Sequence, residues 1–77
     1  MNKEIMDAFI QKANLMENGE QISEMAGNYH IIVRKKESGY HCTIWFANNS
    51  RPMYDNHFST ALNMEAALKR LHYIYFR

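Results

Sequence analysis

The sequence predicts an α+β fold with the element order α-β-β-β-α, in which two helices pack on one face of a three-stranded antiparallel sheet. Two observations lead to this prediction. Apolar residues recur at helical spacing near both ends of the chain, whereas between residues 28 and 47 the side chains divide into two faces with a period of two. Clusters of turn-forming residues separate these segments.

The first helix is predicted over residues 3 to 18. Asn2 suits the N-cap position, and Asn18-Gly19 is expected to end the helix, because glycine accepts the left-handed conformation of a C-terminal cap. Residues 19 to 27 show no sustained period and are predicted to be a connector, with at most a short extended piece around Ile22. The apolar stripe of the helix consists of Ile5, Met6, Phe9, Ile10, Ala13 and Met16.

The central hairpin is predicted from residues 28 to 36 and 40 to 47, with a turn between them. If the loop runs from Lys36 to Gly39, Ile31 faces Ile44 and His30 faces Trp45. A two-residue turn at Ser38-Gly39 would shift these pairs but keep the same faces, whereas a slip by one residue would expose the apolar set and is disfavoured. In the same register Val33 faces Cys42, Tyr29 faces Phe46, Ile32 faces Thr43 and Arg34 faces His41.

Residues 53 to 61 are predicted to form a third, weaker strand. Asn63 then suits the N-cap of a second helix that continues to the C-terminus. Both amphipathic helices need an apolar sheet face to pack against. We therefore expect both to lie on the face that carries Ile31 and Ile44. The stripe of the second helix consists of Met64, Ala67, Leu68, Leu71 and Tyr75.

The opposite sheet face is expected to stay open, because an antiparallel sheet can keep one side in water. Tryptophan and arginine are typical of binding hot spots, so this face is the predicted partner-binding surface. If instead residues 19 to 27 cover this face, with Met25 folded across Trp45, the indole is buried. If the first helix crosses to the other side of the sheet, the open and covered faces are no longer those assigned above. The predicted contact residues are Trp45, Arg34, His30, His41, Thr43, Ile32, Lys35 and Lys36.

The bulk properties predict one small domain over residues 1–77 and limit its chemistry. The net charge of +1 argues against a strongly cationic nucleic-acid binder. Residues 1 to 27 contain two lysines and five acidic residues, whereas residues 28 to 77 contain seven lysines or arginines and three acidic residues. This asymmetry predicts one acidic and one basic side, although solvation alone could account for it.

No catalytic or cofactor motif appears, so an enzyme is not expected, and neither is a cofactor. Cys42 is the single cysteine and lies on the predicted core side, which suits a small buried hydrophobe better than a nucleophile. Three histidines and Asp55 share the open face, but no metal site is predicted, because the ligands would have to converge across three strands.

Nucleic-acid binding is the competing class. The helix, three strands and helix resemble the double-stranded RNA-binding domain in layout, over most of the chain. That family places basic residues at the start of its last helix, whereas this chain has Glu65 there, and Lys69 and Arg70 come later. Alternatively, Trp45 beside Arg34 could stack the bases of a single strand.

The leading hypothesis is a non-enzymatic interaction protein that occludes a surface of a protein or ribonucleoprotein. Small cofactor-free domains of this kind are frequent among phage and mobile-element inhibitors of host defence, including anti-CRISPR proteins, which makes that class the most specific prediction. The expected location is the cytoplasm of a bacterial or infected cell, without membrane insertion. A homodimeric structural protein is a third alternative, suggested by the apolar residues of the C-terminal run HYIYFR, residues 72 to 77.

Overall fold

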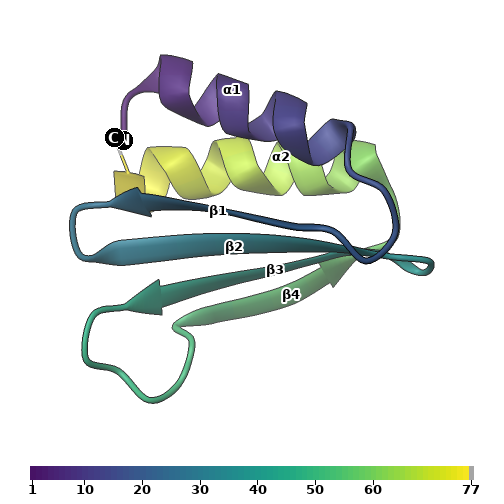
Figure 1. Cartoon of the computed structure of the whole chain (residues 1–77). Coiled ribbons are helices and arrows are strands. Elements are labelled where there is room, and N and C mark those ends of the chain that lie inside the picture. The colour runs from purple at the N-terminus through teal and green to yellow at the C-terminus, as the bar shows by residue number, and fades with distance from the viewer. Residues whose placement is uncertain (77) are drawn as a thin grey trace.

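The computed structural model describes residues 1–76 and places two helices over one face of a four-stranded antiparallel sheet (Figure 1). The α+β class and the two helices agree with the prediction, whereas the number of strands does not. The strands lie in chain order. The elements are α1 (Lys3–Asn14), β1 (Gln21–Ala26), β2 (Tyr29–Lys36), β3 (Gly39–Phe46), β4 (Tyr54–Phe58), α2 (Ala61–Leu71) and the π-helix η1 (His72–Phe76).

The additional strand is β1, so the prediction of a connector over residues 19 to 27 was wrong. β1 pairs along its whole length with β2, with Ile22 opposite Val33 and Glu24 opposite Ile31. An acidic residue therefore occupies the middle of its helix-facing side, and Met25 points to the other side. β1 therefore lacks the apolar alternation that identifies a half-buried strand. Main-chain pairing with β2, rather than side-chain burial, holds this edge strand in the sheet.

The register predicted for the central hairpin is confirmed. Ile31 lies opposite Ile44 and Val33 lies opposite Cys42, with a two-residue turn at Glu37-Ser38. These four side chains are fully buried, so a slip by one residue would move all of them into water.

The first helix has the predicted start but not the predicted end. The Asn2 side chain accepts a hydrogen bond from the Ile5 N–H at 2.8 Å, as an N-cap should. The helix ends at Asn14 rather than at residue 18, because its last turn tightens. The N–H groups of Leu15 and Met16 each donate to the carbonyl three residues earlier, at 3.2 Å.

The second helix begins earlier than predicted. Its N-cap is Thr60, whose hydroxyl accepts from the Asn63 N–H at 3.2 Å, so the assignment of Asn63 as the cap was wrong. β4 correspondingly ends at Phe58, before the predicted residue 61. The wider turn of η1 then shifts the buried stripe, so that Phe76 enters the core and Tyr75 is 36% exposed. Arg77, which the prediction included in this helix, lies outside the described residues.

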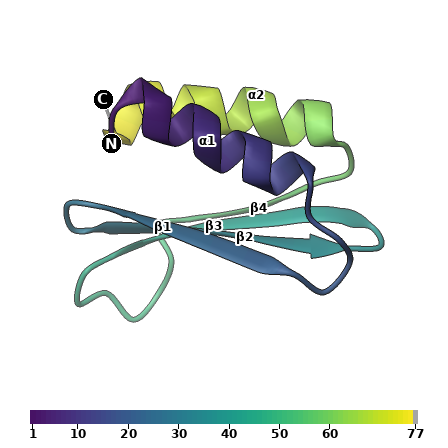
Figure 2. The same cartoon turned by 45° about the horizontal axis from the view of Figure 1, so that its top comes forward.

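Both helices cover the same face of the sheet (Figure 2). α1 contacts β1 and α2, whereas α2 also contacts β3 and β4. The Met1 ammonium group donates to the Phe76 carbonyl at 2.8 Å and joins the two ends of the chain. The largest fully buried side chains are Met6, Ile31, Ile44, Met64, Leu68, Val33 and Cys42. Within residues 1–76, no helix or strand covers the opposite sheet face.

Candidate functional site

The candidate site is the side of the sheet that faces away from the helices, which we call the open sheet face. Successive side chains of a strand point to opposite faces, so the strand pairings determine which residues lie there. The open sheet face consists of Gln21, Ser23, Met25, His30, Ile32, Arg34, Lys36, His41, Thr43, Trp45, Asp55 and His57.

The predicted neighbours on this face are in place. Across β2 and β3, His30 lies opposite Trp45, and Arg34 lies opposite His41. The outer strands extend these pairs into rows, because Met25 lies opposite His30. The other cross-strand pairs on this face are Ile32 with Thr43, Thr43 with Asp55, and His41 with His57.

Side-chain hydrogen bonds orient the two residues expected to contribute most to binding. The Trp45 indole N–H donates to the Thr43 hydroxyl at 3.2 Å. The Arg34 guanidinium donates to the side-chain carbonyl of Gln21 at 3.1 Å. Side chains that are already held in place lose less conformational entropy when they bind a partner.

Imidazoles of the same face are also held by polar contacts. His41 Nε2 lies 2.6 Å from a carboxylate oxygen of Asp55, and His57 Nε2 lies 3.2 Å from the Ser38 hydroxyl. The carboxylate of Asp55 is therefore engaged within the protein and does not stand alone on this surface.

Trp45 is half-buried rather than enclosed. Residues 21 to 26 form a strand in the plane of the sheet, so they do not fold over the indole. Met25 is 59% exposed and is separated from Trp45 by His30 in the same row. The indole therefore keeps part of its surface available on the open sheet face.

A hollow of about 280 Å³ lies on this face and gathers six of the eight predicted contact residues. His30 lies beside the hollow, as the neighbour of Trp45. Lys35 is directed to the opposite side of the sheet, where its ammonium donates to Asn18 at 3.2 Å and lies 5.1 Å from the centre of the Tyr40 ring. The hollow is lined by Gln21, Ile32, Arg34, Lys36, His41, Thr43 and Trp45.

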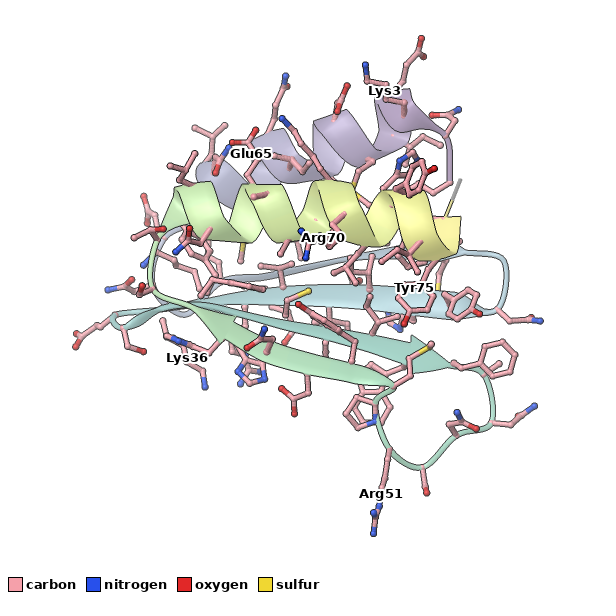
Figure 3. All side chains as sticks on the ribbon, turned by 180° about the vertical axis from the view of Figure 1, so that it is seen from behind. Lys3, Lys36, Arg51, Glu65, Arg70 and Tyr75 are labelled. Atoms are coloured by element: carbon pink, nitrogen blue, oxygen red, sulfur yellow. The ribbon has the colours of Figure 1, made fainter. Side chains whose placement is uncertain are left out.

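The charge of the open sheet face is basic. Within residues 1–76, neither Arg34 nor Lys36 forms an ion pair with a carboxylate. Figure 3 shows Lys36 and Arg51 both extending on the side of the sheet away from the helices. Sequence reasoning missed Gln21, because β1 was not predicted, and Arg51, because it lies in the loop between β3 and β4.

The Cys42 thiol is buried on the helix side of the sheet, away from the open face. Burial, with a smaller contribution from the negative charge of Asp55, raises the pKa of this thiol from 9.0 to about 12. A thiol that stays protonated at neutral pH is a poor nucleophile.

Alkylation tests this assignment directly. At pH 8 the native protein should react with iodoacetamide roughly a thousandfold more slowly than the urea-unfolded chain, because the pKa rises from 9.0 to about 12 and the thiol is enclosed. The unfolded chain ionises first, so the free energy of unfolding should also fall as the pH rises from 9.0 towards about 12. Equal alkylation rates, measured by mass spectrometry, would show that Cys42 is accessible.

Residues 1–76 contain no group of three or more histidine, cysteine, aspartate or glutamate side chains arranged to hold a metal ion. No helix within this range combines the length and the apolar character that crossing a membrane requires. Models of protein families, curated protein sequences and solved structures were compared with the chain, and none of them matches it.

Proposed function

We propose that this protein is a non-enzymatic binding protein that docks its open sheet face onto an acidic surface of a protein or ribonucleoprotein. The observation that supports this most is the hollow that brings Trp45, Arg34 and Lys36 together on one uncovered face. An aromatic anchor beside cations that form no ion pair within residues 1–76 matches the composition of binding hot spots. The hydrogen bonds from Trp45 and Arg34 within the sheet favour rigid docking.

The mechanism in this proposal is occlusion. A rigid sheet covers its target and prevents access to it, without any reacting group. The buried Cys42 thiol, with its raised pKa, supports a role other than nucleophilic catalysis. The most specific form of the proposal is a phage or mobile-element protein of the anti-CRISPR kind, which blocks a host defence complex in the cytoplasm. The free cysteine Cys42 fits the reducing cytoplasm in which such a protein would act.

Paired charge reversals test the docking surface. The variant Arg34→Glu with Lys36→Glu should lose at least tenfold in affinity for a partner captured from extracts of the native host, because it places negative charge against an acidic surface. The control variant, Lys3→Glu with Lys12→Glu, changes the net charge equally but acts on α1. Figure 3 places Lys3 and Lys36 on opposite sides of the molecule.

The measurement is quantitative capture from extracts of the native host, followed by titration of the purified partner against each variant. Equal losses in both variants would mean that net charge rather than the open sheet face governs binding. Full affinity of the Arg34 and Lys36 variant would contradict the proposal.

Nucleic acid is the second candidate, because Trp45 shares the face with Arg34 and Lys36, which form no ion pair within residues 1–76. The start of α2 argues against the double-stranded RNA-binding mode, since residues 61 to 65 contain Glu65 and no cation. Single strands therefore remain the form of nucleic acid to test.

A salt titration separates this candidate from the leading proposal. Binding to a single-stranded oligonucleotide should weaken with a logarithmic slope of about −0.7 for each neutralised phosphate. We expect no binding of a fifteen-nucleotide deoxythymidine strand at 150 mM salt and a shallower slope for the protein partner. Tight, steeply salt-dependent binding of that strand would favour the nucleic-acid module, and a concentration-dependent mass without any partner would favour a homodimer.

A further inference from the structure

A groove of about 590 Å³ lies on the helix side of the sheet, between β4 and the helical segment formed by α2 and η1. The sheet is four strands wide and has two helices to cover it, so the outer strand is left partly uncovered. The small side chains of Ala66 and Ala67 leave space above β4. Tyr54 and Phe58 provide an aromatic floor, and Ile74, which is 57% exposed, provides an apolar wall.

The groove runs beside a strand edge that is open to hydrogen bonding. β4 is the last strand of the sheet. The His57 N–H donates to the side-chain carbonyl of Asn56 at 2.9 Å and therefore does not point to β3. Because the direction of main-chain groups alternates along a strand, the main-chain groups of Asp55 share this outer edge. The segment Tyr54–Phe58 contains no lysine or proline, the residues that commonly block such edges.

The charge in the groove indicates what kind of segment it would accept. Arg70 lines the groove, and Figure 3 shows its side chain directed from α2 towards the sheet. Within residues 1–76, Arg70 forms no ion pair with a carboxylate, and Glu65 on the same helix pairs with Lys69 at 3.7 Å. A bound segment with a carboxylate at this point would complete the site.

A second copy of the chain does not provide that carboxylate. If two β4 strands paired edge to edge, the helix-facing side chains brought to the groove would be Tyr54, Asn56 and Phe58, none of which is acidic. Asp55 points to the open sheet face. Charge complementarity therefore favours a different protein over a homodimer.

We propose that β4 binds an extended acidic segment of a partner protein as a fifth strand of the sheet. Main-chain hydrogen bonds to Asp55 and His57 hold the segment, and the Asn56 side chain gives up its bond to the His57 N–H. An apolar side chain of the segment enters the groove against Phe58 and Ile74, and an aspartate or glutamate two residues along the segment pairs with Arg70. This site is separate from the open sheet face and would supply a second contact or a second partner.

The probe is a display library of random nine-residue peptides, selected on the folded protein and then measured as fluorescent peptides by anisotropy. The selected peptides should contain an acidic residue two positions from an apolar one, since groove-facing side chains recur with a period of two. Arg70→Glu should weaken their binding at least tenfold. Replacing the acidic residue of the peptide with lysine should restore binding to Arg70→Glu.

Three controls make the outcome decisive. Trp45→Ala should leave peptide binding unchanged, because Trp45 lies on the other face, and Arg70→Glu should keep the melting temperature of the unmodified protein. Two sets of peptides should be compared, N-methylated at odd or at even positions. Methylation of the nitrogens that point to β4 should abolish binding, and methylation of those that point away should leave it unchanged, as strand addition requires. The proposal is overturned if the selected peptides lack an acidic residue two positions from an apolar one, or if Arg70→Glu binds them as tightly as the unmodified protein. It is also overturned if sedimentation shows a dimer formed through β4.

Discussion

Replacing Gly39 with alanine is expected to destabilise the protein strongly. Gly39 is buried at the start of β3 and has a φ of +133°, which side-chain-bearing residues rarely adopt. A Cβ atom there would collide with the carbonyl oxygen of Phe58 and approach the Cα of Ser59 to 2.9 Å. Both neighbours are main chain, so the strain could be relieved only by separating β3 from the end of β4.

We expect a loss of about 3 kcal/mol or more in the free energy of unfolding, which is a large share of the stability of a small domain. The melting temperature should fall by more than about 12 °C. Gly27→Ala is the matched control, because Gly27 also has a positive φ, +60°, but a Cβ added there would have no atom within 4 Å beyond its two chain neighbours. That control should lose only about 1 kcal/mol. Equal melting temperatures for the two variants would contradict the close approach at Gly39.

Ile44→Ala is expected to destabilise the protein by about 2–5 kcal/mol, the usual range for a fully buried aliphatic side chain. Ile44 has no exposed surface and packs within the core cluster that includes Ile31 and Leu68. Its chain neighbour Trp45 points to the opposite face and is half-buried. Trp45→Ala should therefore cost only about 1 kcal/mol, the scale of a cross-strand side-chain pair.

This pair of adjacent substitutions measures the sidedness of the sheet by urea denaturation. A larger loss from Trp45→Ala than from Ile44→Ala would mean that the indole belongs to a core. The open sheet face would then not be a docking surface.

The parts of the fold that sequence reasoning predicted are those in which burial and pattern agree. Ile31 and Ile44 lie on opposite strands of one hairpin and are both enclosed, so their alternation fixed the register. Asn2 was identified as a cap because its side chain satisfies a main-chain N–H without help from the rest of the fold. Such local or fully buried features leave a clear pattern in the sequence.

The errors occurred where the main chain or a distant contact decides the structure. β1 carries Glu24 between its helix-facing residues, so no apolar period marks it, although its pairing with β2 is complete. η1 changes the helical phase, so Phe76 rather than Tyr75 is buried. The position of Lys35 follows from strand alternation, but its cluster with Lys36 in the sequence suggested a shared surface.

The groove beside β4 could not be predicted, because it depends on how far α2 extends over a sheet whose width was underestimated. Arg70 shows the consequence. In the sequence it is an ordinary cation in the last turn of a helix, whereas in the structure it lines a groove of about 590 Å³ beside β4.

The central claim is that the open sheet face, with Trp45 at its hollow, is the surface that binds a partner. The most direct measurement is the affinity of Trp45→Ala for the captured partner, determined by calorimetry at a temperature where the variant is shown to be folded. The account predicts a loss of about 2 kcal/mol or more in binding free energy, as for a hot-spot residue. Unchanged affinity in the folded variant would contradict it.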